Sequence, residues 1–191
     1  MNPDDTWTVV RKEQRKKPIK VETTFNIQIL TGTKVKIEIT QSQPDRYTSK
    51  RMKDIYHRCL TSILTTSDQK EYEELFIKHH AKFTELSWLA YNGKLLIGLI
   101  TLDLADSNGF NIKNLAVDPF YQKKGIGHKL VESLLTYSKM IGITKLSLFL
   151  NETNIAAIKI FLENGFVEEA RGNDQYLIEI GMRKVYMSKQ L

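Results

Sequence analysis

The stretch Leu115-Ala-Val-Asp-Pro-Phe-Tyr-Gln-Lys-Lys-Gly-Ile-Gly127 runs from an apolar strand through a proline turn into a glycine-rich helix start. Gly125 and Gly127 leave the backbone amides uncovered, and the apolar spacing that follows predicts an amphipathic helix to about Met140. Free amides at the positive end of a helix dipole favour a bound anion. With two lysines in the same turn, the sequence predicts a cradle for a pyrophosphate group.

A Gly-x-Gly before a helix also occurs in tight turns that bind no ligand. The stretch lacks the third glycine of a dinucleotide fingerprint and the Gly-Lys-Ser/Thr of a Walker loop, which disfavours both of those nucleotide sites. Gln122-Lys-Lys-Gly-Ile-Gly127, after a strand that ends Ala-Val-Asp-Pro, resembles the coenzyme A loop of the GNAT superfamily of N-acetyltransferases. Asn154-Ile-Ala-Ala-Ile-Lys-Ile-Phe-Leu-Glu-Asn-Gly-Phe166 is similar to the family's Asn-x-x-Ala-x-x-x-Tyr-x-x-x-Gly-Phe helix, and the resemblance covers about residues 35–191.

This resemblance implies a GNAT-type acyl-CoA N-acyltransferase fold. That fold is of the α/β class, with a mixed, mostly antiparallel central sheet flanked by helices, and here an extra N-terminal strand is expected. The resemblance also implies acetyl coenzyme A as cosubstrate, without a metal, and the amide of Val117 as the donor to the reacting carbonyl oxygen. The residues that it places along the cofactor are Leu115, Ala116, Val117, Gln122, Lys123, Lys124, Gly125, Ile126, Gly127, His128, Asn154, Ala157 and Phe161.

The segment 154–166 leaves two interpretations open at Asn154, and three other positions depart from the family pattern. Asn154 either contacts the cofactor or caps its helix. Phe161 stands where many members carry a proton-donating tyrosine, so we expect it to pack beside the cofactor sulfur. Asn111 and Phe149 replace a glutamate base and a histidine found in some members. No general base is evident, and the side chains that can take the proton through water are Glu85, Asp103 and Tyr176.

Hydrophobic periodicity predicts the remaining elements in the order βααβββαβαββ. Alternation predicts two N-terminal strands around the Thr31-Gly-Thr33 turn, and helical spacing predicts helices over 49–65 and from Asp68 to about residue 82. Strands are expected at 86–91, 95–104, 110–117 and 146–150, with a hairpin turn at Asn92-Gly93. The resemblance makes the two helices a wall of the acceptor channel, and the aromatic residues that either line it or pack in the core are Tyr47, Tyr56, Tyr72 and Phe76.

Composition predicts one domain over residues 23–191 preceded by a basic arm. The chain has 191 residues, 41% of them hydrophobic and 26% charged, and no apolar run that approaches the roughly 18 residues of a membrane span. The N-terminus lacks the apolar core of a secretory signal, so we expect an intracellular protein, cytoplasmic or nuclear, that is not bound to a membrane. A single cysteine, Cys59, excludes a disulfide framework, and His57, His79 and His80 lack zinc-ligand spacing.

The net charge of +6 is concentrated in the arm, because residues 11–20 hold six basic residues against one acidic residue. Such a segment cannot fold alone, so residues 1–22 are expected to be flexible. The arm is either a solvated tail or a contact for nucleic acid, ribosomes, an acidic protein or a nuclear import receptor, with Trp7 as a candidate anchor.

Three functions are compatible with these patterns. The first is acetyl transfer from acetyl coenzyme A to an amine of a protein or peptide, or of a small molecule such as a polyamine. The second is a coenzyme-A-binding pseudoenzyme or regulatory subunit, which the replacements at Asn111, Phe149 and Phe161 favour. The third is an adaptor that contacts nucleic acid or ribosomes through residues 11–20. The fold alone does not choose among them.

Overall fold

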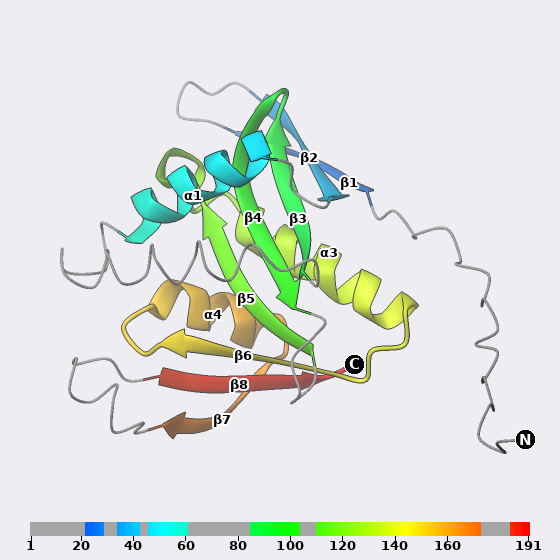
Figure 1. Ribbon diagram of the computed structural model, residues 1–191, viewed down its shortest axis with the longest axis vertical. Helices are drawn as coiled ribbons and strands as arrows, with labels where there is room; N and C mark the ends of the chain where they lie inside the picture. Colours follow the sequence, from blue (N-terminus) through cyan, green and yellow to red (C-terminus); the bar gives the residue numbers. More distant parts are fainter. Residues whose placement is uncertain (1–21, 29–33, 43–45, 61–84, 104–109, 173–183) are drawn as a thin grey trace, which may run out of the picture.

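The computed structural model describes residues 22–28, 34–42, 46–60, 85–103, 110–172 and 184–191 (Figure 1). Within these residues the elements follow in the order β1 (Glu22–Gln28), β2 (Lys34–Ser42), α1 (Arg46–Leu60), β3 (Glu85–Asn92), β4 (Leu95–Asp103), β5 (Phe110–Val117), the 3-10 helix η1 (Pro119–Tyr121), α3 (Ile126–Met140), β6 (Lys145–Asn151), α4 (Ile155–Glu163), β7 (Val167–Gly172) and β8 (Lys184–Gln190).

The described strands form one eight-stranded sheet in the order β1-β2-β3-β4-β5-β6-β8-β7. Neighbouring strands are antiparallel at every junction except β5–β6, which is parallel. The predicted turn at Asn92-Gly93 closes the β3–β4 hairpin, and Gly93 has the positive φ of 58° that a side chain disfavours. The expectation of a mixed, mostly antiparallel sheet with an extra N-terminal strand is confirmed, and that strand is β1 at the edge of the sheet.

Helix α1 covers one face of the sheet. Met52 and Ile55 are fully buried against Leu99 and Ala116 of β4 and β5, and half-buried Cys59 packs at the edge of the same cluster. Because positions 52, 55 and 59 recur at helical spacing, they form one apolar stripe, which packs against the sheet.

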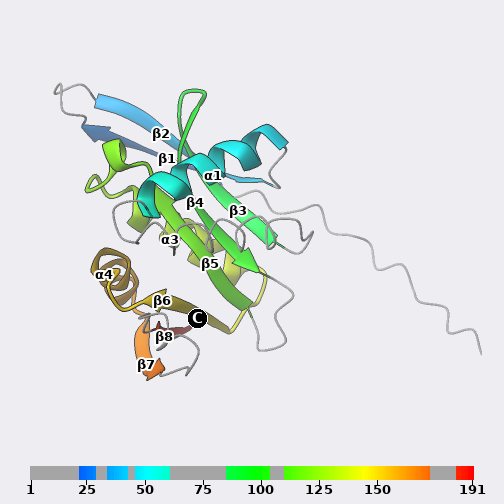
Figure 2. The same ribbon diagram turned by 60° about the vertical axis from the view of Figure 1, so that its left-hand side comes forward.

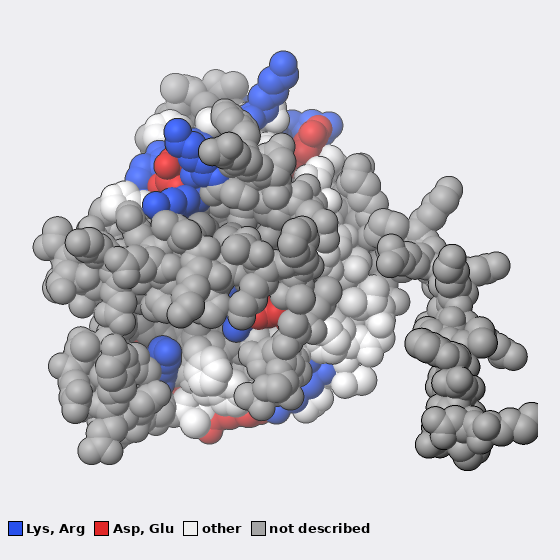
Figure 3. All heavy atoms as spheres, in the orientation of Figure 1, with Lys and Arg blue, Asp and Glu red and all other residues white. Residues whose placement is uncertain are grey.

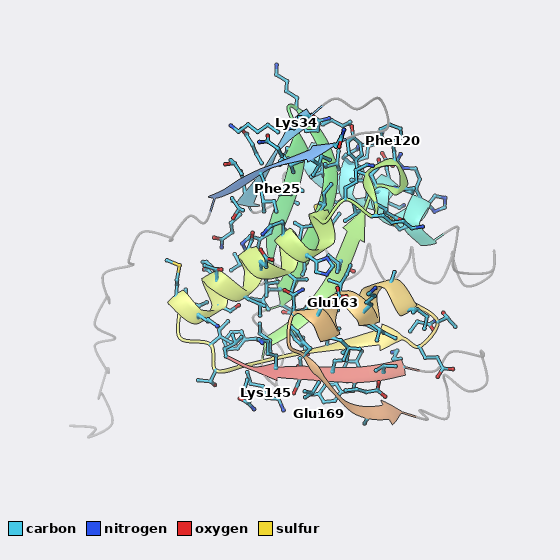
Figure 4. The ribbon with its side chains drawn as sticks, turned by 180° about the vertical axis from the view of Figure 1, so that it is seen from behind. Phe25, Lys34, Phe120, Lys145, Glu163 and Glu169 are labelled. Carbon is cyan, nitrogen blue, oxygen red and sulfur yellow. The ribbon has the colours of Figure 1, made fainter. Side chains whose placement is uncertain are left out.

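Helices α3 and α4 cover the opposite face. Figures 1 and 4 view the sheet from opposite sides, with α1 in front in the first and α3 in front in the second, and Figure 2 gives an intermediate view. Leu130 and Leu134 of α3 and Phe161 of α4 belong to one buried cluster with Trp88 and Ile100 of the sheet. Strand β4 lies between the two helical layers, so all its residues except Leu95 are buried.

The predicted element order is confirmed for the described residues, with differences at element ends. Helix α1 begins at Arg46, three residues before the predicted start at residue 49, because its polar first turn carries no apolar periodicity. The helix predicted from Asp68 to about residue 82 lies outside the described residues. Within the described part of the chain, no helix has the length and apolar character needed to cross a membrane.

Candidate active site

Strands β5 and β6 diverge after a short shared start. They pair over three register positions, Phe110–Leu146, Asn111–Ser147 and Ile112–Leu148. Figure 1 shows β5 leaving β6 as it continues to Val117. Beyond Ile112, β5 keeps β4 on one side but has no register partner on the β6 side among the described strands. The predicted splaying of these strands is therefore present.

The main chain of β5 presents polar groups to this opening. The amide of Asp118 donates a hydrogen bond of 2.8 Å to the carbonyl of Ile97 on β4. Hydrogen-bonded and non-hydrogen-bonded pairs alternate along an antiparallel ladder. The amide and carbonyl of Ala116 therefore face β4, whereas those of Leu115 and Val117 face away from it. Leu115 and Val117 have the orientation needed to pair with an extended ligand, and Ala116 does not.

The carbonyl of Val117 already has two side-chain donors. It accepts hydrogen bonds from the Cys59 thiol at 3.1 Å and from the Gln122 side-chain amide at 3.0 Å. Burial raises the pKa of the Cys59 thiol, which keeps the thiol protonated as a donor. These bonds connect α1 and the start of the predicted cradle to the end of β5.

The turn after β5 is fixed at both of its ends. One carboxylate oxygen of Asp118 caps η1 by accepting the Phe120 amide at 3.1 Å, and the Asp118 side chain is buried. At the other end, buried Tyr121 accepts a hydrogen bond of 3.0 Å from the Asn92 side-chain amide in the β3–β4 hairpin. The loop therefore approaches α3 in a defined direction.

The start of α3 has the properties of an anion site. Lys123 and Gly125 have left-handed backbones, with φ of 57° and 80°. Gly125 is the N-cap of α3 and provides no side-chain acceptor for the first-turn amides. Such amides require an acceptor, which a bound anion supplies. The main chain at residues 123–127 could therefore hold an anion, as the sequence predicts for the pyrophosphate.

Glycine is favoured at the two positions of the loop for different reasons. A Cβ atom added at Gly125 would meet no atom within 4 Å, so the positive φ is what favours glycine there. A Cβ atom added at Gly127 would lie 2.9 Å from Cδ1 of Ile160, so Gly127 lets α3 approach α4. The sequence predicted an open approach for a ligand at both positions, and the helix contact at Gly127 depends on a residue 33 positions away.

Three buried polar side chains lie side by side at the paired start of β5 and β6, just before these strands diverge. Asp103, Asn111 and Ser147 come from β4, β5 and β6, and Asn111 is the register partner of both others. The Ser147 hydroxyl donates to the Asn111 side-chain carbonyl, and Lys113 forms an ion pair of 3.6 Å with Asp103. Buried polar groups are costly without partners. The ion pair with Lys113 offsets this cost for the Asp103 carboxylate, which lies close to the point where β5 and β6 diverge.

The Acetyltransferase (GNAT) family model matches residues 49–166, which is more than half of the chain. This chain belongs to the GNAT family. The ribosomal protein bS18-alanine N-acetyltransferase of Escherichia coli K12 is 34% identical over 88 residues, which are 46% of this chain and 58% of that protein. The GNAT chain thus spans a little over half the length of this relative. The enzyme of the same name from Salmonella typhimurium LT2 is 29% identical over 129 residues, covering 60% of this chain and 85% of that protein.

Solved GNAT structures share the fold. The PaiA N-acetyltransferase of Thermoplasma acidophilum, in complex with coenzyme A, has a TM-score of 0.64 at 17% identity and covers 80% of this chain and 99% of its own. The S18-alanine N-acetyltransferase of Escherichia coli has a TM-score of 0.60 at 20% identity and covers 80% of this chain and 93% of its own. The predicted family and fold are confirmed.

In this GNAT chain, the predicted residues of α4 make contacts within the protein. The Asn154 side chain caps α4 by accepting the Ala157 amide at 3.2 Å, which is one of the two roles predicted for it. Ala157 and Phe161 are buried, and the Phe161 ring packs edge-on against Phe166 with centroids 5.1 Å apart. At the first turn of α3, the His128 ring lies 2.6 Å from the Glu163 carboxylate of α4.

Other predicted residues lie at the margin of the site or outside the described part. Phe149 is largely exposed and packs on Tyr186, with ring centroids 4.9 Å apart. The residues or side chains outside the described part are Tyr47, Tyr56, Tyr72, Phe76, His79, His80, Glu85, Tyr176 and the arm with Trp7. Among the residues that the structure describes, no three or more His, Cys, Asp and Glu side chains gather as a metal site.

The ion pairs of Asp118 belong to the site, although no sequence motif indicates them. Arg58 lies 2.6 Å and Arg51 lies 3.7 Å from the same Asp118 carboxylate oxygen. Seven residues are about two helical turns, so Arg51 and Arg58 share one face of α1. That spacing could have indicated a shared basic face on the helix, but nothing in the sequence identified its acidic partner.

Proposed function

We propose that this chain transfers an acetyl group from acetyl coenzyme A to an amine of a protein or peptide. The observation that carries the proposal is that the free main chain at the end of β5 is followed by the anion-binding start of α3. The outward-facing main chain of Leu115 and the amide of Val117 lead, through the turn at residues 118–122, to the start of α3, whose first-turn amides have no side-chain cap. An extended arm that leads into a pyrophosphate fits both sites at once.

Acetyl coenzyme A supplies an acyl thioester when it is bound. The Val117 amide is proposed to donate to the thioester oxygen, and one such donor contributes on the order of 3 kcal/mol to transition-state stabilisation. Holding the amine and the acyl group together lowers the barrier by roughly 7–11 kcal/mol. Phe161 has no proton to donate, so coenzyme A is expected to leave as the thiolate.

The proton of the amine is proposed to pass through a chain of water molecules to Asp103, whose register partner Asn111 lies six residues along β5 from Val117. Of the three candidates for this role, Asp103 is the one whose side chain the structure describes. Asp103 lies beside Asn111 at the paired start of β5 and β6. Its ion-pair partner, Lys113, remains partly exposed. A carboxylate in this position can accept a proton without contacting the amine directly.

Two observations support a protein or peptide acceptor. The relatives from Escherichia coli and Salmonella typhimurium are named for an alanine of ribosomal protein bS18. The family match also includes α1 from residue 49 onward, and the resemblance makes this helix a wall of the acceptor channel. A small amine is the alternative acceptor, and a pseudoenzyme that binds coenzyme A without turnover is the alternative function.

The test is release of coenzyme A from acetyl coenzyme A by the full chain, with three acceptor groups. These are peptides with a free N-terminal alanine, the same peptides with a blocked N-terminus but a free lysine, and polyamines. Turnover with free N-terminal peptides supports the proposal. Turnover only with polyamines contradicts the acceptor class, and calorimetric binding of coenzyme A without any turnover identifies a pseudoenzyme.

A further inference from the structure

The Asp118 carboxylate uses its two oxygens for two different elements. Oδ1 accepts the Phe120 amide and so shapes the turn that leads to the cofactor loop. Oδ2 lies 2.6 Å from Nη2 of Arg58 and 3.7 Å from Nη2 of Arg51, both on α1. The Asp118 side chain is only 6% exposed. A carboxylate at this depth is strongly destabilised when its cationic partner is removed.

A second contact joins the same end of α1 to the same loop. Cys59, next to Arg58, donates to the Val117 carbonyl, which also accepts the Gln122 side-chain amide. The C-terminal part of α1 is therefore bonded to the last residue of β5 and to the residue that starts the turn. Figure 4 labels Phe120 in this turn, and Figures 1 and 4 both show the turn beside α1.

We propose that Asp118 and Arg58 form a latch by which α1 positions the coenzyme A loop. Asp118 and Arg58 are positioning residues, because the latch acts through the main chain of residues 119–127. The inference rests on the proposed binding of coenzyme A at this loop. Since coupling between two sites is reciprocal, a loop ordered by coenzyme A also orders the helix on the acceptor side. Cofactor binding thereby prepares the acceptor wall.

The direction in which one substitution changes coenzyme A affinity distinguishes this latch from a general effect of charge at the site. Asp118→Asn keeps a side-chain oxygen for the Phe120 amide but removes the charge that holds Arg58. If Asp118 acted only through its negative charge, its removal would strengthen binding of the polyanionic coenzyme A. The latch predicts the opposite, with affinity about tenfold weaker, within the usual range of site-to-site coupling.

Arg58→Gln provides the second variant, with Lys50→Gln as its matched control. Both residues are exposed on α1, where Figure 3 shows Lys and Arg side chains gathered, and both substitutions remove one positive charge. Of these two residues, Arg58 is the one that forms an ion pair with Asp118 in the described part of the chain. Arg58→Gln should weaken coenzyme A binding several-fold more than Lys50→Gln, and Arg58→Lys should restore part of the loss.

The experiment measures coenzyme A affinity by calorimetry for the full-length chain, these four variants and the double variant Asp118→Asn/Arg58→Gln. The latch predicts that the double variant binds no more weakly than the weaker single variant. It also predicts faster hydrogen exchange of the amides of residues 120–127 in Asp118→Asn, without acceleration in β8. A purely structural role would accelerate exchange in both regions.

The outcomes distinguish the latch from the proposed function. If the unsubstituted chain binds no coenzyme A, the proposed function fails. If it binds coenzyme A and Asp118→Asn binds equally well or more tightly, the latch is overturned while the function stands. Equal losses for Arg58→Gln and Lys50→Gln, or additive losses in the double variant, also overturn the latch.

Discussion

The sole cysteine of the chain, Cys59, reports on the contact between α1 and the end of β5. Burial raises the pKa of its thiol, so less thiolate is present at pH 8 than in a free cysteine. Alkylation by iodoacetamide, followed by intact mass, should therefore be slower at pH 8 than that of a cysteine peptide. The rate should keep rising at pH values where the peptide rate has levelled off. A protein rate equal to the peptide rate at pH 8 would contradict the buried, hydrogen-bonded thiol.

The proposed proton acceptor Asp103 can be tested without disturbing the cofactor loop. Asp103→Asn preserves the shape of the side chain but removes the carboxylate, so kcat should fall by about 100-fold, as for loss of a general base. Coenzyme A affinity should stay within about twofold, since the contacts in the loop at residues 122–127 are unchanged. Asp54→Asn, which removes an exposed carboxylate from α1, is the control. Unchanged kcat in Asp103→Asn would exclude this role.

At the scale of elements, the approach of α3 to α4 depends on Gly127. Gly127→Ala places a Cβ atom 2.9 Å from Cδ1 of Ile160, so melting temperature and coenzyme A affinity should both fall. Ile160→Val removes that Cδ1 atom and should restore much of the melting temperature when combined with Gly127→Ala. Gly125→Ala has space for its Cβ but a φ of 80°, so it should cost about 1–2 kcal/mol in the free energy of unfolding. Absence of rescue by Ile160→Val would show that the helix contact is not the cause.

The elements were predictable where periodicity and turn residues act locally. Asn92-Gly93 identified the β3–β4 hairpin, and the Asn154 cap identified the start of α4. The direction of the main chain at Ala116 was not predictable, because it depends on which β5 residues bond to β4. The pairing of Arg58 with Asp118 was hidden for the same reason, since it joins residues 60 positions apart.

At the scale of the whole molecule, the sheet consists of two antiparallel blocks joined at the short β5–β6 junction. The blocks contain β1 to β5 and β6 to β8, and three register pairs join them. The coenzyme A arm is proposed to lie along the opening between the blocks. Family resemblance made the divergence of these strands predictable. The side-by-side placement of Asp103, Asn111 and Ser147 was not, because it depends on the register of β4, β5 and β6.

The basic arm is expected to act separately from this sheet. Residues 1–21 lie outside the described part, and the domain boundary near residue 22 remains a prediction. Deletion of residues 1–20 should leave melting temperature and coenzyme A affinity unchanged. Retention on RNA should weaken, and retention by the intact chain should fall steeply with added salt because several phosphates release counterions. A fall of many degrees in melting temperature would instead show that the arm packs on the domain.

The backbone conformation of Lys123 lowers the stability of the fold, whereas its positive charge is proposed to favour coenzyme A binding. A lysine at φ 57° has a left-handed backbone, which costs a residue with a Cβ atom about 1–2 kcal/mol. Asparagine tolerates this conformation better. Lys123→Asn should raise the melting temperature while weakening coenzyme A binding through the lost positive charge, and Lys123→Ala should weaken binding without the gain. A gain in melting temperature together with a loss of coenzyme A affinity in Lys123→Asn would show that this lysine serves anion binding at the expense of stability.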